Sequence, residues 1–138
     1  MKLIKTLTGI TWIAIMLVAC GGAGGDSLNG TSWELYAISK HFPLEGSNIT
    51  IAFEDGQVSG HSGCNSYGGE YQISGDKIEF GILMSTMMAC ADPAMMEQEA
   101  TFMQDLGDAQ RFEILNGQLL IYWTEHEALT FSPVKQDR

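Results

Sequence analysis

The sequence predicts an α+β fold that is mostly antiparallel β, a curled sheet or partly open barrel of about eight strands packed with one α-helix. Three observations lead to this prediction. Short runs of alternating apolar and polar residues recur, tight-turn dipeptides separate several of them, and only one segment has the spacing of an amphipathic helix. With 138 residues, 45% of them hydrophobic, the chain can form the core of one modest domain.

The N-terminal half contains three predicted strands, at residues 32–38, 49–53 and 57–60. In the first of them, Trp33, Leu35 and Ala37 recur at every second position, which is the period of a strand with one face in the core. The other two are separated by Asp55-Gly56, a dipeptide that favours a two-residue turn. These two strands are therefore expected to form a hairpin.

The middle of the chain begins with a glycine-rich bend at residues 63–69 and continues with a second predicted hairpin. The strands of this hairpin are residues 70–73 and 77–80, with Ser74-Gly75-Asp76 as the turn. The run Ile82–Ala89 that follows is apolar at both odd and even positions and carries no charge. Such a run is typical of a strand buried on both faces, and we expect one here.

One α-helix is predicted, from Pro93 to Leu106. Asp92 can accept hydrogen bonds from the free amides of the first turn, Pro93 has no amide to leave unpaired there, and Gly107 is suited to end the helix. The residues expected on its buried side are Met95, Met96, Phe102, Met103 and Leu106.

The C-terminal third is predicted to return to strands, at residues 111–115, 118–124 and 129–131. The first two are joined by Asn116-Gly117, the dipeptide best suited to a type I′ turn.

The first twenty residues have the pattern of an export signal. Lys2 and Lys5 precede an apolar run from Leu7 to Val18 that is too short for a comfortable membrane span. The segment ends in Leu-Val-Ala-Cys20, which resembles the bacterial lipobox, whose cysteine receives a diacylglycerol and becomes the mature N-terminus. The alternative is an ordinary signal peptide with an incidental cysteine. We therefore expect a lipoprotein signal peptide at 1–20, lipidated at Cys20, then a flexible glycine-rich tether at 21–27 and one domain at 28–134.

Removal of the signal would leave five Lys and Arg against 17 Asp and Glu, a formal charge of −12. Such acidity makes nucleic acids and anionic headgroups poor partners, because each would be repelled. Solubility is the simplest explanation for the acidity, and a cationic partner or ion is the alternative.

Several motifs together resemble the META/HslJ-like domain family. They are an opening LNGTSWEL at residues 28–35, GCNSYGGEY at 63–71, TMMAC at 86–90 and a closing LTFSP at 129–133. A helix that contains Glu97, Glu99, Phe102 and Leu106 follows the third motif, as in the family. The resemblance implies a partly open barrel with one packed helix, often carried by envelope lipoproteins associated with heat shock or with resistance to antibiotics such as novobiocin. It implies no catalytic residue.

The remaining two cysteines, Cys64 and Cys90, are expected to form a disulfide, because an exported protein meets an oxidising compartment. One alternative is a nucleophilic Cys64 with His61 as its base and Asn65 as an orienting group. A second alternative is a metal site made by His61, Cys64 and Cys90.

The six methionines beyond the signal are Met84, Met87, Met88, Met95, Met96 and Met103. They fall in the expected buried strand and on the apolar side of the helix, so core packing is the favoured interpretation. Their thioethers are also soft donors suited to Cu(I), which leaves copper binding as the alternative.

The bend has a structural interpretation of its own. Gly63 and Gly69 permit bends or bulges, and Asn65 tolerates the left-handed region and can bond back to its own chain. Tyr71, with Tyr67, Trp33 and Trp123, either belongs to the core or lines a small cavity at the barrel mouth.

Together these features predict a non-enzymatic, lipid-anchored protein of the cell envelope, at the outer membrane and facing the periplasm. It is expected to act in envelope or heat stress tolerance or antibiotic resistance, without a cofactor, by binding a protein or a small apolar ligand. A periplasmic copper-binding protein is the alternative. Gly21 after the lipidated cysteine is compatible with sorting to the outer membrane.

Overall fold

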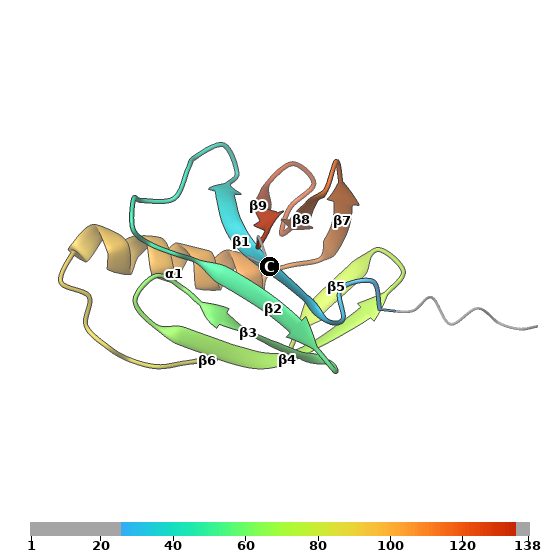
Figure 1. Ribbon diagram of the computed structural model, residues 1–138, viewed down its shortest axis with the longest axis horizontal. Coiled ribbons are helices and arrows are strands. Elements are labelled where there is room, and N and C mark those ends of the chain that lie inside the picture. Colours follow the sequence, from blue (N-terminus) through green and yellow to red (C-terminus); the bar gives the residue numbers. More distant parts are fainter. Residues whose placement is uncertain (1–25, 135–138) are drawn as a thin grey trace, which may run out of the picture.

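A computed structural model describes residues 26–134 of the chain (Figure 1). The predicted signal peptide, the lipidation at Cys20 and nearly all of the predicted tether lie outside the described residues. The elements are β1 (Thr31–Ile38), β2 (Thr50–Glu54), β3 (Gln57–His61), β4 (Ser66–Ser74), β5 (Lys77–Phe80), β6 (Met84–Ser85), α1 (Pro93–Gly107), β7 (Arg111–Leu115), β8 (Gln118–Tyr122) and β9 (Ala128–Pro133). In this part of the chain no helix is long and apolar enough to cross a membrane.

The strands form one antiparallel sheet that closes on itself. Their order is β3-β2-β1-β9-β8-β7-β5-β4-β6, and a further pairing of β3 with β4 closes a ring of eight strands. The ring is uneven, because β5 and β7 share a single registered pair, Lys77 with Arg111. β6 stands outside the ring as an extra strand on β4. The predicted curled, partly open barrel with one helix is confirmed.

The tight turns that were predicted from dipeptides are present. Asp55 and Gly56 have φ angles of 48° and 77°, and Asn116 and Gly117 have 53° and 79°. Two consecutive residues in the left-handed region are what a type I′ hairpin turn requires, and asparagine, aspartate and glycine tolerate that region best.

The barrel interior is filled by apolar side chains, as the alternation in the sequence predicts. Trp33, Leu35 and Ala37 of β1 all face the core. The helix adds Phe102 and Leu106, and the Phe102 ring lies 5.7 Å from that of Tyr67 and 6.4 Å from that of Phe131 (centroid to centroid). The ring of Phe102 therefore ties the helix to strands on both sides of the barrel.

The aromatic residues considered for a cavity at the barrel mouth belong to this core. Tyr67, Tyr71 and Trp33 are buried, and Trp123 is half-buried against the same cluster. Burial raises the pKa of Tyr67 and is also the main cause of the raised pKa of Tyr71, whose hydroxyl donates to the carboxylate of Asp26.

The prediction of a fully buried strand at Ile82–Ala89 is wrong. Only Met84 and Ser85 are in a strand, and Ile82 is 88% and Met87 97% exposed. The reason is that, among residues 26–134, this segment pairs only with β4, at the outer margin of the sheet. The sequence of an apolar strand does not reveal whether it has one neighbouring strand or two.

The prediction that the methionines pack in the core is wrong for four of the six and holds for Met103, which packs against the core cluster. Met84, Met87, Met88 and Met96 are exposed, while Met95 and Met103 are only partly buried. The helix also continues one residue further than predicted, through Gly107, and is capped by Asp108, whose amide donates to carbonyl oxygens of the last turn.

Candidate functional site

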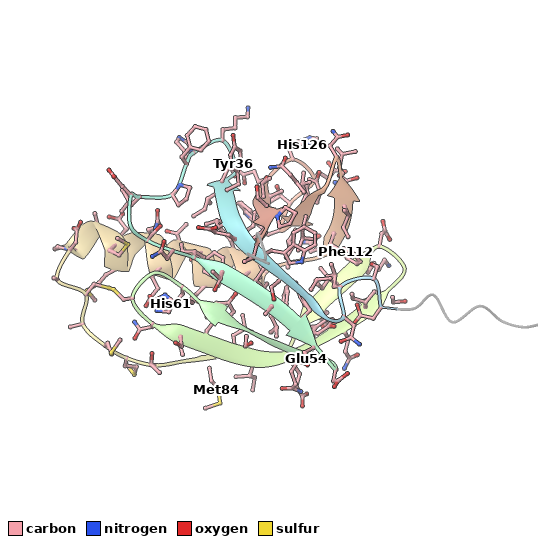
Figure 2. All side chains as sticks on the ribbon, in the orientation of Figure 1. Tyr36, Glu54, His61, Met84, Phe112 and His126 are labelled. Carbon is pink, nitrogen blue, oxygen red and sulfur yellow. A yellow bond between two sulfur atoms is a disulfide. The ribbon has the colours of Figure 1, made fainter. Side chains whose placement is uncertain are left out.

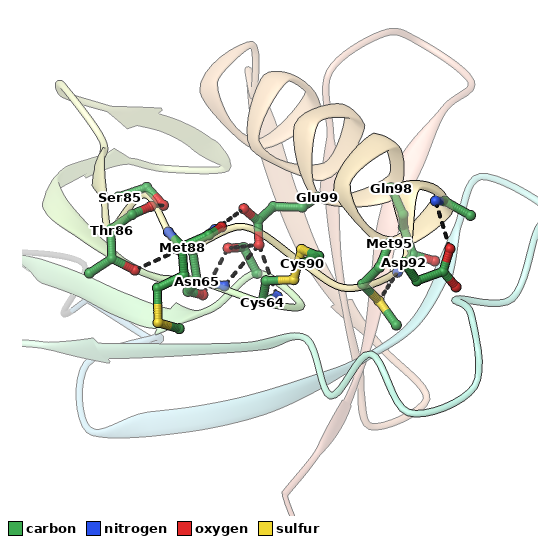
Figure 3. Close-up of a disulfide and its surroundings, with 12 residues drawn as sticks. Cys64, Asn65, Ser85, Thr86, Met88, Cys90, Asp92, Met95, Gln98 and Glu99 are labelled. Atoms are coloured by element: carbon green, nitrogen blue, oxygen red, sulfur yellow. Dashed lines mark hydrogen bonds between the residues drawn. A yellow bond between two sulfur atoms is a disulfide. The ribbon is translucent and has the colours of Figure 1, made fainter.

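The bend that leads into β4 is joined covalently to the segment before the helix. Cys64 and Cys90 form a disulfide with their Cα atoms 5.8 Å apart, which confirms the predicted pairing (Figure 3). The chain reaches this geometry through Gly63, whose φ of +127° lies in a region that side chains disfavour. The bridge holds the start of β4 close to the entry of α1.

Asn65, next to the disulfide, is buried and uses its whole side-chain amide. Its Oδ1 accepts hydrogen bonds from the Met88 amide at 2.7 Å and the Thr86 hydroxyl at 2.9 Å. Its Nδ2 donates to the Met88 carbonyl at 3.2 Å and to Oε1 of Glu99 at 2.6 Å. The left-handed backbone considered for Asn65 is not found, because its φ is not positive, and its side chain bonds to distant parts of the chain rather than to its own bend. Asn65 instead connects three segments that are distant in the chain.

Glu99 of α1 completes this cluster from the helix side. Its Oε2 accepts hydrogen bonds from the backbone amides of Cys64 and Asn65, both at 2.9 Å, and from the Ser62 hydroxyl at 3.0 Å. Partial burial raises the pKa of Glu99, but these donors together favour the carboxylate more strongly, so its pKa is lowered. From the sequence alone, Glu99 is recognised only as part of the helix that follows the third family motif. Its spacing of three and seven residues from the buried Phe102 and Leu106, on the same helix face, was the signal that could have shown its role.

The arrangement does not support the thiol alternatives proposed from the sequence. Both sulfur atoms belong to the disulfide, so neither is available as a thiolate nucleophile. His61 does not join the cysteines as a third ligand. Within the described part of the chain, the three residues whose ligand atoms lie within 4.8 Å of one another are Cys64, Cys90 and Glu99.

The most unusual surface lies along residues 82–88, which we call the exposed strip. Its exposed apolar side chains are Ile82, Met84, Met87 and Met88. Figure 2 shows Met84 pointing away from the barrel. The backbone of the strip is nevertheless well fixed. The Thr86 amide donates to the carbonyl of Ser66 at 3.0 Å, and both the N–H and the C=O of Met88 are hydrogen-bonded to the side chain of Asn65.

Close packing also fixes the beginning of the strip. The carbonyl oxygen of Ile82 and the side chain of Leu83 lie against Gly69, where a Cβ atom would come within 2.8 Å and 3.0 Å of them. Gly69, singled out from the sequence as a bend residue, therefore allows the strip to approach β4.

A hollow lies between the loop after β1 and the first half of α1. It has a volume of about 370 Å³ and its lining includes Ile38, Phe42, Leu44 and Ala94. The Leu44 amide donates to Oε1 of Gln98 at 2.6 Å, which fastens the loop to the helix. Phe42 is largely exposed, so this groove adds a further apolar surface on another side of the helix.

These features define a small β-barrel domain with eight strands in a closed sheet and one helix. The helix is fixed to the barrel by the Cys64–Cys90 disulfide and by the hydrogen bonds between Asn65 and Glu99. The family model of the META domain matches residues 26–136. The chain therefore belongs to the META domain family.

Several solved structures share this fold. An NMR structure of a protein from Burkholderia xenovorans has a TM-score of 0.69 at 28% identity, with 79% of this chain and 85% of that chain covered. A second NMR structure has a TM-score of 0.63 at 24% identity over 77% and 91% of the two chains. A crystal structure of a DUF4847 family protein from Bacteroides vulgatus gives 0.57 at 14% identity, over 81% and 98%. No curated protein matches the chain.

Proposed function

We propose that this META domain protein works without catalysis, as a lipid-anchored envelope protein that binds another protein through the exposed strip. The observation that carries the proposal is the contrast between exposure and order in that strip. Four of its seven side chains are apolar and exposed, namely Ile82, Met84, Met87 and Met88, yet its backbone is fastened to Asn65, Ser66 and Gly69. A contiguous exposed apolar surface marks interaction sites, and a fixed backbone lowers the entropy that binding would cost.

A protein partner fits better than a small apolar ligand. The aromatic residues that could have lined a cavity at the barrel mouth are packed in the core. The apolar side chains of the strip are exposed, whereas small molecules are usually held in concave sites. The proposed lipid anchor on Cys20 rests on the lipobox motif. The proposed role in envelope or heat stress tolerance, or in antibiotic resistance, rests on the family resemblance.

The test is photo-crosslinking in living cells. A photo-reactive amino acid replaces Met87, which is 97% exposed in the strip, and in a control it replaces Leu115, which is 51% exposed on β7. We expect one discrete protein adduct at position 87 that is absent at 115, and heat sensitivity on deletion of the gene. Identical adducts at both positions, or no adduct at either, would contradict protein binding through the strip.

Copper handling is the second candidate, and one observation favours it. The thioethers of Met84, Met87 and Met88 face solvent on one short segment instead of filling the core. Such thioethers are soft ligands suited to Cu(I). Changing all three to leucine separates the candidates, because leucine keeps the apolar surface and removes the sulfur. In the crosslinking experiment position 87 carries the photo-reactive amino acid, so there only Met84 and Met88 are changed to leucine. We expect the adduct to survive these changes, whereas loss of micromolar Cu(I) binding in the variant with all three leucines would establish the copper candidate.

A further inference from the structure

The exposed strip contains a free strand edge. β6 pairs with β4 at Met84 and Ser85 and is the last strand in the sheet order, so its other edge has no neighbouring strand among residues 26–134 (Figure 1). The amide of Thr86 donates to the carbonyl of Ser66 in β4. Because residues of an antiparallel strand alternate in the direction of their backbone groups, the N–H and C=O of Ser85 point away from β4.

Apart from its length of only two residues, this edge lacks the features that usually prevent a strand from pairing with another chain. Natural sheets guard their edges with lysine, proline, inward charges or a covering element. From Phe80 to Ala91 the sequence has no charged residue and no proline, although the whole chain has a net charge of −10. The side chains that flank the free edge, Met84 and Met87, are exposed.

Acidic residues lie at both ends of this uncharged segment. Glu70 and Glu79 line a polar hollow of about 300 Å³ together with Gly81, directly before the strip. Asp92 follows the segment at its other end, where it caps α1. The edge is therefore uncharged at its centre and negative at its ends.

We propose that β6 accepts an extended segment of a partner protein as an additional strand, and that this segment is uncharged at its centre and carries lysine or arginine on its flanks. The inference rests on the proposed function, protein binding through the exposed strip, and specifies how the partner binds and what its chemistry is. Backbone hydrogen bonds to Ser85 provide affinity in such strand addition, and complementary charges select the partner.

A second copy of the chain is a poorer occupant of this edge. Antiparallel pairing of two β6 strands would bring the glutamates at one end of the segment toward Asp92 of the other copy. Like charges would then oppose each other at both ends. A partner with basic flanks removes this repulsion.

The test uses the full chain in detergent and a synthetic peptide with five alternating valine and threonine residues between two pairs of lysines. We expect saturable binding, and amide hydrogen exchange at Ser85 that slows by about tenfold or more at saturation. A peptide with N-methyl groups on its central residues keeps its charges and side chains but cannot form the ladder. We expect it to bind at least about tenfold more weakly.

The charge requirement has its own control. The Glu70→Gln/Glu79→Gln variant should bind the lysine peptide several-fold more weakly at low salt, because it loses two charges that attract the lysines. Removing charges at the rim of an interface typically has an effect of this order. Glu125→Gln, an exposed change in the loop between β8 and β9, should leave binding unchanged.

Three outcomes would overturn strand addition. They are no binding of the lysine peptide, equal binding of its N-methylated form, and dimerisation of the chain through β6 in sedimentation. An adduct at Met87 without slowed exchange at Ser85 would reject strand addition alone and leave protein binding intact. Absence of the adduct rejects the proposed function itself.

Discussion

The side-chain amide of Asn65 donates a 2.6 Å hydrogen bond to the carboxylate of Glu99, and the backbone amide of Asn65 donates a second bond to the same group at 2.9 Å. This double contact joins the start of β4 to the middle of α1 across 34 residues of sequence. The same asparagine holds Met88 of the exposed strip. Helix, barrel and strip therefore meet at one pair of residues (Figure 3).

The first prediction concerns Glu99→Gln. The change keeps the shape of the side chain but removes the negative charge that accepts four hydrogen bonds. Bonds to charged groups contribute about 1.5–3 kcal/mol each when fully desolvated. Glu99 is partly exposed, so solvent screening lowers the expected total loss in the free energy of unfolding to about 1–2 kcal/mol. Urea unfolding at pH 7 measures it.

The control is Glu97→Gln on the same helix. Glu97 is exposed, so its change should alter stability by less than about 0.5 kcal/mol. Acid adds a second check. Because the folded pKa of Glu99 is lowered, its stabilisation is complete above the unfolded value of 4.5 and is lost as the pH falls through the folded pKa. A difference between native protein and Glu99→Gln that stays constant down to pH 2 would contradict this role.

The second prediction concerns the disulfide. Cys64 and Cys90 are separated by 26 residues, and closing a loop of this size restricts the unfolded chain by about 2–4 kcal/mol. We expect the double change Cys64→Ala/Cys90→Ala to lower the free energy of unfolding by that amount in urea titrations. A reducing agent should lower the stability of the native protein similarly and leave the variant unaffected. Equal sensitivity of both proteins to the reductant would argue against the bridge.

The hairpins could be predicted from the sequence because their signals are local. Asp55-Gly56 and Asn116-Gly117 specify their turns within two residues. The contact between Asn65 and Glu99 could not be predicted in the same way, since it depends on the topology that brings the helix back to β4. The exposed strip was misread for a related reason. Its composition fits a buried strand, but within the described part of the chain it has a neighbouring strand on one side only, which leaves it at the surface.

The third prediction is that the folding stability depends on pH through Asp105, near the C-terminal end of α1. Burial is the main cause that raises the pKa of Asp105, and together with the charges of Glu127 and Asp108 it brings this pKa to about 6. Between the unfolded value of 3.8 and about 6, the folded protein therefore binds more protons than the unfolded chain. The stability that Asp105 contributes is therefore fully present at a pH below 3.8, its pKa in the unfolded chain, and is lost as the pH rises through its folded pKa of about 6.

Asp105→Asn should remove this dependence, since asparagine does not titrate. We expect the variant to gain stability relative to the native protein as the pH rises from 4 to 7, on the order of 1 kcal/mol after allowance for solvent screening. Unfolding temperatures across this pH range measure the difference. Asp76→Asn, in the exposed turn between β4 and β5, serves as the control and should show no such trend. A constant offset between Asp105→Asn and the native protein would contradict the raised pKa.

The last prediction links the barrel to the exposed strip through Gly69→Ala. A Cβ atom at Gly69 would lie 2.8 Å from the carbonyl oxygen of Ile82, a backbone atom that can yield only if the strip moves away from β4. We expect faster amide hydrogen exchange across residues 82–88 and a loss of about 1–3 kcal/mol in the free energy of unfolding. Gly68→Ala is the matched control on the neighbouring residue, because its Cβ would meet only the Val58 carbonyl at 3.4 Å. The crosslink at Met87 should weaken in Gly69→Ala and persist in Gly68→Ala, since partner binding depends on a strip that is held in place. Faster exchange in the strip with an unchanged crosslink would show that its order is not needed for binding.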